Sequence, residues 1–134
     1  MIDSVQVIKL EPKYVRENVL QVLELDSIKI PDGIEIKDQS IVHMFPGAVG
    51  GNHKHPRIEI FIGFGDLAFY YMEDELKSIK FGNDIGFMKM IVVPSMLPHA
   101  VRNESDTEQA VLYELANAKQ YDSVQVEVIK NILK

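Results

Sequence analysis

The sequence predicts an all-β protein built as an antiparallel sandwich or barrel. Short extended runs recur along the 134 residues. The intervals between them carry turn-forming residues, for example PDG at 31–33 and GND at 82–84. Strands separated by such turns pair antiparallel, whereas βαβ units would place helical patterns between them. A chain of this length fits one domain, so we expect residues 1–134 to form a single domain.

The expected strands follow one another along most of the chain. In order, they cover residues 4–10, 19–25, 39–45, 51–55, 58–63, 67–72, 76–81, 88–93, 99–103 and 109–115. The turns between them lie at 31–33, 46–47, 50–51, 63–66, 73–75, 82–84 and 104–106, where Gly, Pro, Asn, Asp and Ser gather. This regular spacing is what predicts the sandwich or barrel.

Two segments do not fit a single element. Residues 14–23 have apolar side chains at helical spacing and follow Pro12, which can start a helix, but their β-branched content favours a strand. The C-terminal segment 122–134 alternates from Val124 to Val128 and then changes to Ile129, Ile132 and Leu133. We therefore expect a strand that passes into a helix there.

The composition limits the partners and cofactors. The chain has no cysteine, so disulfides and thiolate metal sites are excluded and nitrogen and oxygen remain as ligands. A formal net charge of -6 argues against a nucleic-acid partner, because phosphate binding needs clustered Lys and Arg. No run approaches the roughly 18 apolar residues of a membrane span, and the N-terminus lacks a basic segment followed by an apolar one. We expect no membrane partner and a cytoplasmic location.

Potential metal ligands share one face of the chain after residue 52. His53, His55 and Glu59 have the same parity, so one strand, or two short ones continued across Pro56, points them the same way. His99, in the expected strand 99–103, would complete a shell with open positions for water or substrate. The histidine pair alone is more typical of two surface imidazoles. The full set suits one divalent Mn, Fe, Co, Ni or Zn ion better than Mg or Ca.

The spacing of these residues resembles the two motifs of the cupin superfamily. The first motif runs through residues 47–59 and the second through residues 94–103. The matching residues are Gly47, His53, His55, Glu59, Pro94, His99 and Asn103. The resemblance implies a small single-domain cupin, whose fold is an antiparallel double-stranded β-helix or jelly-roll barrel, with His53, His55, Glu59 and His99 as metal ligands.

The sequence departs from the cupin pattern at its glycines. Gly65 follows Glu59 one residue early, and Gly86 stands two residues too far before Pro94. Met96 stands where the second motif usually has glycine. A methionine there pays a steric cost at the positive φ that glycine accepts freely. The four ligand positions are unaffected by these departures.

The resemblance leaves two classes of function open, both with a small molecule as the partner. In the first, the chain is a metal-dependent enzyme. Isomerase or epimerase chemistry on a sugar or hydroxy acid is preferred, because a small domain needs little more than the metal and one base; decarboxylase and Fe-dependent dioxygenase chemistry also fit. In the second, the barrel is a ligand-binding or sensing module without turnover. Fold alone does not decide between them.

Three further residues are candidates for acid or base catalysis. His43, just ahead of the first motif, would act as a general base if it faced inward. Tyr71 and Tyr113 are the candidate acids, and only one of Tyr70 and Tyr71 can face inward. More commonly, however, such a histidine is only partly exposed or hydrogen-bonded, and such tyrosines are core residues with the hydroxyl at the rim of the barrel.

The neighbours of the ligands are candidates for substrate binding. Phe61 has the parity of Glu59, and Arg57 and Arg102 would clamp a carboxylate or phosphate, although an exposed salt bridge is the commoner fate of an arginine. The opposite face of the same strand is wholly apolar, from Ile58 to Phe64. This face needs cover, either from the N-terminal segment or from a second subunit, and we expect a homodimer.

Overall fold

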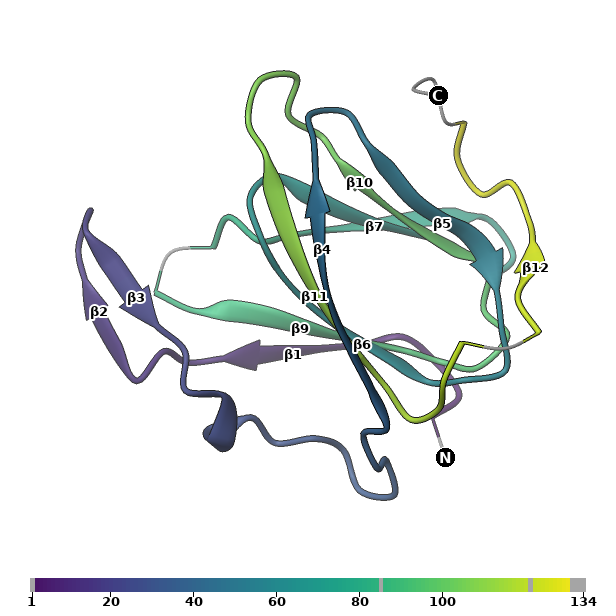
Figure 1. The fold of residues 1–134 in the computed structure, drawn as a ribbon, viewed down its shortest axis with the longest axis horizontal. Helices are drawn as coiled ribbons and strands as arrows, with labels where there is room; N and C mark the ends of the chain where they lie inside the picture. The colour runs from purple at the N-terminus through teal and green to yellow at the C-terminus, as the bar shows by residue number, and fades with distance from the viewer. Residues whose placement is uncertain (1, 85, 121, 131–134) are drawn as a thin grey trace.

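In the described residues, two antiparallel sheets of five strands each form the body of the protein, beside a third sheet of two strands (Figure 1). The structure is a computed structural model and describes residues 2–84, 86–120 and 122–130. In chain order its elements are β1 (Gln6–Leu10), β2 (Tyr14–Arg16), β3 (Leu20–Val22), the 3-10 turn η1 (Leu25–Ser27), β4 (Asp38–Met44), β5 (Val49–Lys54), β6 (Glu59–Phe64), β7 (Leu67–Met72), β8 (Leu76–Phe81), β9 (Met88–Val93), β10 (His99–Asn103), β11 (Ala110–Ala116) and β12 (Val124–Gln125).

Strands β4 to β11 divide between the two sheets as in a jelly roll. The first sheet has the order β1-β9-β6-β11-β4 and the second the order β12-β5-β10-β7-β8. Each sheet pairs strands that are distant in sequence, such as β4 with β11 and β5 with β10. Two Greek keys closed into a double sheet give this arrangement. The expected all-β jelly-roll barrel is confirmed, and the bounds of β4 to β11 agree with the expected strands within two residues.

A hydrophobic cluster occupies much of the space between the two sheets. Phe61, Phe69, Ile91 and Leu112 belong to it and are all nearly or fully buried. Strand alternation explains their selection, because every second residue of β6, β7, β9 and β11 faces inward. Phe61 has the parity of Glu59, so the cluster adjoins the candidate ligands.

A second hydrophobic cluster lies on the outer face of the first sheet. Ile60 and Ile62 of β6 belong to it and are at most 1% exposed, together with residues of β1, β9 and β11. Apolar residues of the segment from 23 to 36 pack against this cluster. The N-terminal segment therefore covers most of the apolar face within one chain, although Phe64 at the end of β6 remains 45% exposed.

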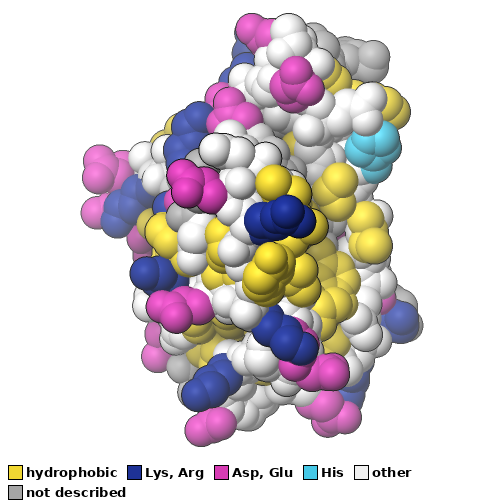
Figure 2. All heavy atoms as spheres, turned by 90° about the vertical axis from the view of Figure 1, so that its left-hand side faces the viewer, with side chains coloured by type: hydrophobic (Ala, Val, Ile, Leu, Met, Phe, Trp, Pro, Cys, Tyr) yellow, Lys and Arg dark blue, Asp and Glu magenta, His cyan; other side chains and the backbone are white. Residues whose placement is uncertain are grey.

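Residues 14–22 form a β-hairpin rather than a helix. Strands β2 and β3 pair antiparallel, and Asn18 takes a positive φ of 58° in the turn between them. The β-branched content thus decides the ambiguity of this segment. The hairpin shows apolar side chains to solvent, with Tyr14 53% and Val19 63% exposed. Figure 2 looks onto this side of the molecule and shows hydrophobic side chains gathered among Lys and Arg.

The C-terminal segment adds the short strand β12 to the edge of the second sheet. Val124 and Gln125 pair with Lys54 and His53 of β5. Residues 126–130 contain no helix, and the backbone N–H of Val128 is bonded to Asn52 Oδ1 instead. The remainder of the expected helix, residues 131–134, lies outside the described residues. Within the described ranges, no helix is both long and apolar enough to cross a membrane.

Candidate functional site

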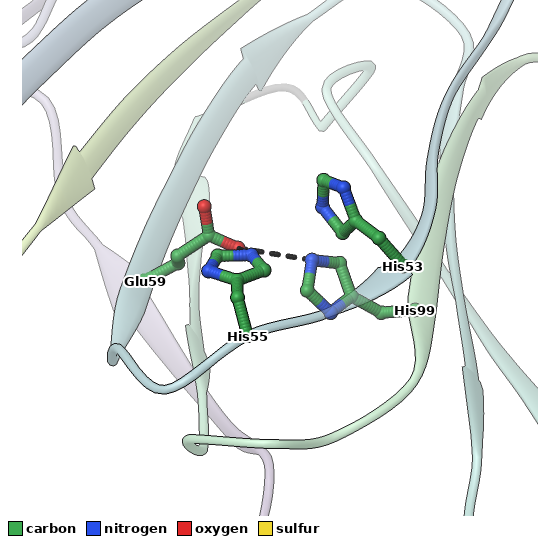
Figure 3. Close-up of side chains that lie close together, drawn as sticks. All are labelled: His53, His55, Glu59 and His99. Atoms are coloured by element: carbon green, nitrogen blue, oxygen red, sulfur yellow. Dashed lines mark ion pairs between the residues drawn. The ribbon is translucent and has the colours of Figure 1, made fainter. Parts of the chain in front are cut away.

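His53, His55, Glu59 and His99 converge at one end of the barrel (Figure 3). His53 is on β5, His55 follows that strand, Glu59 begins β6 and His99 begins β10. One nitrogen or oxygen from each of the four side chains lies within 4.8 Å of those of the others. The structure thus brings together the four residues that the motif spacing singled out.

The register between β5 and β10 places two of these side chains next to each other. His99 is directly opposite His53 in the ladder, and the register shifts after His99. Gly51 allows the strands to approach at this point: its φ is 100°, and a Cβ there would lie 3.0 Å from the backbone of His99 and Ala100. The N–H of Met96 donates to the carbonyl of His55 at 2.9 Å, which ties the turn before β10 to the same end of β5.

The lone pairs of the site face one another. Nδ1 of His99 lies 2.8 Å from the carbonyl oxygen of Leu97, which only accepts, so this nitrogen carries the proton. In the neutral ring Nε2 is then an acceptor, and it lies 2.9 Å from Glu59 Oε1. Nε2 of His55 lies 3.1 Å from the same oxygen. Among the residues that the structure describes, these three buried atoms have no hydrogen-bond partner.

A cation bound between these unpartnered acceptor atoms would satisfy all of them. Buried polar atoms are normally hydrogen-bonded, so buried polar atoms without a partner need an explanation. Nitrogen and carboxylate oxygen atoms are ligands for divalent transition metals, and the bond from His99 to Leu97 is the kind of outer contact that orients a ligating imidazole. The residues present therefore suit the metal that the cupin motifs imply.

Burial and charge favour the ligand forms of two side chains. Burial, helped by the neighbouring imidazoles, lowers the pKa of His53 to about 4, which keeps its ring neutral. Burial alone would raise the pKa of Glu59, yet that pKa lies well below its usual range, and Oε2 of Glu59 accepts a charged hydrogen bond from Arg57, which favours the ionised carboxylate. Neutral imidazole and ionised carboxylate are the states that bind metal.

A cavity of about 140 Å³ opens beside the ligands. Its walls come from both sheets and are formed by Val42, Met44, Gly50, Gly51, His53, Phe61, His99, Val101, Leu112, Glu114 and Gln120. Most of these side chains are apolar. Among the described residues, the cavity therefore offers one ionisable group besides the candidate ligands, which is the carboxyl of Glu114.

Glu114 is a site residue that the sequence reasoning missed. It lies on β11 opposite Phe61 of β6 and lines the same cavity as His53 and His99. Burial, together with the nearby carboxylate of Glu59, raises the pKa of Glu114 to about 7. A signal was present, because Glu114 has the parity of Leu112 within a strand that was predicted to have a buried face.

Two of the other candidates lie at the cavity or beside it. Phe61 lines the cavity. Tyr71 is directly opposite His99 in the pairing of β7 with β10, so the two side chains share a face. Its ring stacks on the buried Phe69 at 5.4 Å between centroids. Tyr70 points the other way and donates to Glu104, so Tyr71 is the tyrosine of this pair that faces inward.

His43 and Tyr113 are on the outer face of the first sheet. Val42 and Met44 line the cavity, so His43 between them points outward, where it is exposed and bonded to Gln109. Tyr113 packs against the outer cluster. The structure does not bring either side chain to the candidate ligands.

Neither arginine candidate opens into the cavity. Arg57 is buried at 6% exposure and its terminal nitrogens contact Glu59, Asp38 and the carbonyl of Ala118. Arg102 alternates with the cavity residue Val101 and lies 4.0 Å from Glu104. Both side chains are therefore directed to groups of the protein.

The comparison with known proteins supports the fold. No family model and no curated protein matches the chain. A 3,4-ketoisomerase from Helicobacter canadensis is 20% identical, over 90% of this chain and 90% of that one, with a TM-score of 0.71. The 3,4-ketoisomerase QdtA from Thermoanaerobacterium thermosaccharolyticum, a mutant in complex with TDP-4-keto-6-deoxyglucose, is 18% identical, over 93% and 89%, with a TM-score of 0.69.

A third similar structure belongs to a longer protein. The capsular polysaccharide assembling protein CapF from Staphylococcus aureus is 24% identical over 67% of this chain, with a TM-score of 0.59. The chain spans only 27% of that protein's length. At these identities the likeness establishes the fold, and the chain has the fold of the cupin superfamily, as its motifs implied.

Proposed function

We propose that this chain is a metal-dependent isomerase that moves a carbonyl group along a sugar or a related hydroxy acid. One observation carries the proposal: the ligand atoms of His53, His55, Glu59 and His99 converge beside a cavity whose other charged wall is the carboxyl of Glu114. A cation site next to an acid–base group is the equipment that enolisation needs.

Each residue at the cavity has a separate role in the proposed reaction. Glu114, whose raised pKa lies near neutrality, takes the proton from the carbon that bears the hydroxyl group and returns it to the former carbonyl carbon. Tyr71 beside His99 is the proposed acid that protonates the former carbonyl oxygen, and it regains a proton from the hydroxyl oxygen that becomes the new carbonyl. Phe61 and the apolar cavity wall exclude water. A divalent transition metal held by the four ligands would stabilise negative charge on the substrate oxygens. The reaction needs no oxidant or reductant.

The size of the cavity indicates how much of a substrate it encloses. At about 140 Å³, it is smaller than the roughly 300–1,000 Å³ of sites that bury a whole drug-sized ligand. It suits the few reacting carbons of a hydroxy ketone while the rest of the molecule lies outside. The similar ketoisomerases, one bound to TDP-4-keto-6-deoxyglucose, support a keto sugar, including one carried on a nucleotide.

Proton exchange with solvent tests the proposal even where the product is not identified. The metal-loaded protein is incubated in D₂O with TDP-4-keto-6-deoxyglucose and a panel of ketoses and hydroxy acids, and deuterium at carbon is followed by NMR. We expect incorporation next to the carbonyl of one substrate class. It should stop when the metal is removed and in Glu114→Gln, while Glu108→Gln, an exposed acid on the preceding loop, should behave as wild type.

The other outcomes would replace the proposal. Binding of a panel member without exchange would favour a sensing module. Oxygen consumption with an iron-loaded protein would make the chain a dioxygenase. Exchange that persists in both the metal-free protein and Glu114→Gln would remove the two groups on which the proposed reaction depends.

A homodimer is the assembly that the exposed hairpin favours. Tyr14 and Val22 are opposite each other on one face of β2–β3, and Val15 lies on the other face, all three at least 42% exposed. An isolated two-stranded hairpin is marginally stable, so a second copy that covers it would stabilise it. We expect wild type to sediment as a dimer and Val19→Glu, at the hairpin turn, as a monomer; a wild-type monomer would contradict this assembly.

A further inference from the structure

Arg57 occupies a buried position directly behind the metal-ligand candidate Glu59. Its Nη2 lies 2.7 Å from Glu59 Oε2, and its Nη1 lies 2.8 Å from Asp38 Oδ2 and 3.0 Å from the carbonyl oxygen of Ala118. Both terminal nitrogens are thus bonded to acceptors of the protein. The side chain is only 6% exposed. Its bond to Glu59 is buried, whereas the bonds to Asp38 and Ala118 are part-buried. Charge-assisted hydrogen bonds of this kind are the strong ones.

The partners of Arg57 are themselves fixed by the fold. Asp38 begins the edge strand β4, and Lys119 reaches its other oxygen at 3.1 Å. The segment that supplies Ala118 is held next to Arg57, because Ile58 and Asn117 exchange two hydrogen bonds, at 2.9 and 3.2 Å. The guanidinium therefore sits between two segments that are distant in sequence from the ligand motif.

The two oxygens of Glu59 have different surroundings as a result. Oε2 is taken by Arg57, whereas Oε1 lies 3.1 Å from His55 Nε2 and 2.9 Å from His99 Nε2. Turning Oε2 towards the histidines would break the buried contact with Arg57. The carboxylate is held with one oxygen at the site and the other outside it.

We propose that Arg57, anchored by Asp38, is a positioning residue that makes Glu59 a ligand through a single oxygen. The inference rests on the metal site proposed above and adds a role for two residues outside the ligand set. It also replaces the role expected for Arg57 from its place beside the ligands, because a buried guanidinium bonded to Glu59 and Asp38 is not open to a substrate carboxylate or phosphate.

The consequence would be a metal site with an open coordination position. A carboxylate bound through both oxygens would fill one more coordination position than a carboxylate bound through one. By holding Oε2, Arg57 keeps that position for water or for a substrate oxygen. The positive charge of Arg57 would by itself weaken the binding of a cation, so its benefit comes from orientation.

Metal affinity and the spectrum of the cobalt form test this role in the full chain. Apparent Kd values for Zn and Co are measured by competition with a chromophoric chelator for wild type, Arg57→Met, Arg57→Lys, Asp38→Asn and Lys80→Met. Lys80→Met is the control, since it removes one positive charge and a surface ion pair with Asp66 far from the site. Thermal unfolding of the metal-free proteins shows whether each variant is folded.

We expect Arg57→Met to weaken binding by about 10- to 100-fold, the range typical of lost outer partners of a metal site. Its cobalt absorption spectrum should change, because the freed second oxygen alters the coordination. Asp38→Asn should move both readouts less and in the same direction. Arg57→Lys should restore them only in part, because an ammonium cannot hold both acids in the geometry of a guanidinium. Lys80→Met should match wild type.

Several outcomes would overturn the inference. An Arg57→Met variant with the metal affinity and cobalt spectrum of wild type would do so. Tighter metal binding with an unchanged spectrum would also do so, because Arg57 would then act on the metal only through its charge. If Arg57→Met does not fold, unchanged affinity and spectrum in both Asp38→Asn and Arg57→Lys decide against it. A wild-type protein that binds none of the transition metals would instead defeat the metal site itself.

Discussion

The backbone N–H of Met96 donates a hydrogen bond of 2.9 Å to the carbonyl of His55. This bond joins the turn before β10 to the residue that follows β5, so a backbone hydrogen bond holds together the segments that carry His55 and His99. Met96 makes the bond at a positive φ of 65°. Its side chain is 45% exposed, so packing offsets the strain of this conformation only in part.

Met96→Gly should stabilise the protein. Glycine accepts a positive φ without the steric cost that a Cβ brings, and the methionine side chain, 45% exposed, is only partly buried. We expect a gain of about 1 kcal/mol in the free energy of unfolding, measured by denaturant titration of the metal-free protein. Met96→Ala is the matched control and should show no such gain, since alanine keeps the Cβ. A stability loss in Met96→Gly would show that the side chain contributes through packing.

Removing a ligand should remove the metal and leave the fold. His53→Ala deletes one nitrogen donor from a half-buried position, in a chain without cysteine to replace it. We expect metal affinity to fall by more than the about 10- to 100-fold that loss of an outer partner costs. Elemental analysis of untagged protein measures the metal content, and circular dichroism shows whether the fold is kept. His43→Ala, on the outer face, should keep full metal content; equal content in both variants would refute the shared shell.

Acid should release the metal, since protons compete with it for the imidazoles and for Glu59. Burial lowers the pKa of His53 to about 4 in the metal-free protein, so its ring stays neutral until the pH falls near that value. Release should therefore be centred below the ordinary histidine value of about 6.5. Metal content after equilibration between pH 7 and pH 3 measures this, and full retention well below pH 4 would speak against histidine ligands.

Glu114 should make the metal-free protein less stable as the pH rises. Its folded-state pKa is about 7, against an ordinary value of 4.5. Between these values the folded chain holds a proton that the unfolded chain has released, so stability falls with rising pH across this window. Glu114→Gln removes this loss, and its Tm advantage over wild type should grow from pH 5 to pH 8. Glu108→Gln should show no such trend; a constant difference for Glu114→Gln would rule out the shifted pKa.

The strands and the shared face of the ligands were predictable because both depend on local patterns. Strand bounds followed from turn residues, and the common side of His53 and His55 followed from alternation with a period of two. The pairing of His53 with His99 was implied only by the cupin resemblance, since ladder register is set by packing that no local pattern records.

The remaining site roles depend on contacts between distant segments. Arg57 looked free to bind substrate because its partners, Asp38 and Ala118, come from other parts of the chain. His43 sits in β4, where both faces carry apolar residues, so alternation could not tell inside from outside. Glu114 was hidden for a related reason: a charged residue in a strand is usually assigned to the solvent side.

The jelly-roll order also governs when the proposed metal site can form during folding. β1 pairs with β9 and β4 with β11, and proteins dominated by such distant pairings fold in about milliseconds to seconds. His53 and His99 meet only when β5 and β10 have paired. A metal that requires both residues would bind the closed barrel and not the unfolded chain, so the free metal concentration would enter the folding equilibrium directly. Newly made chains would then acquire their metal last and gain stability from it.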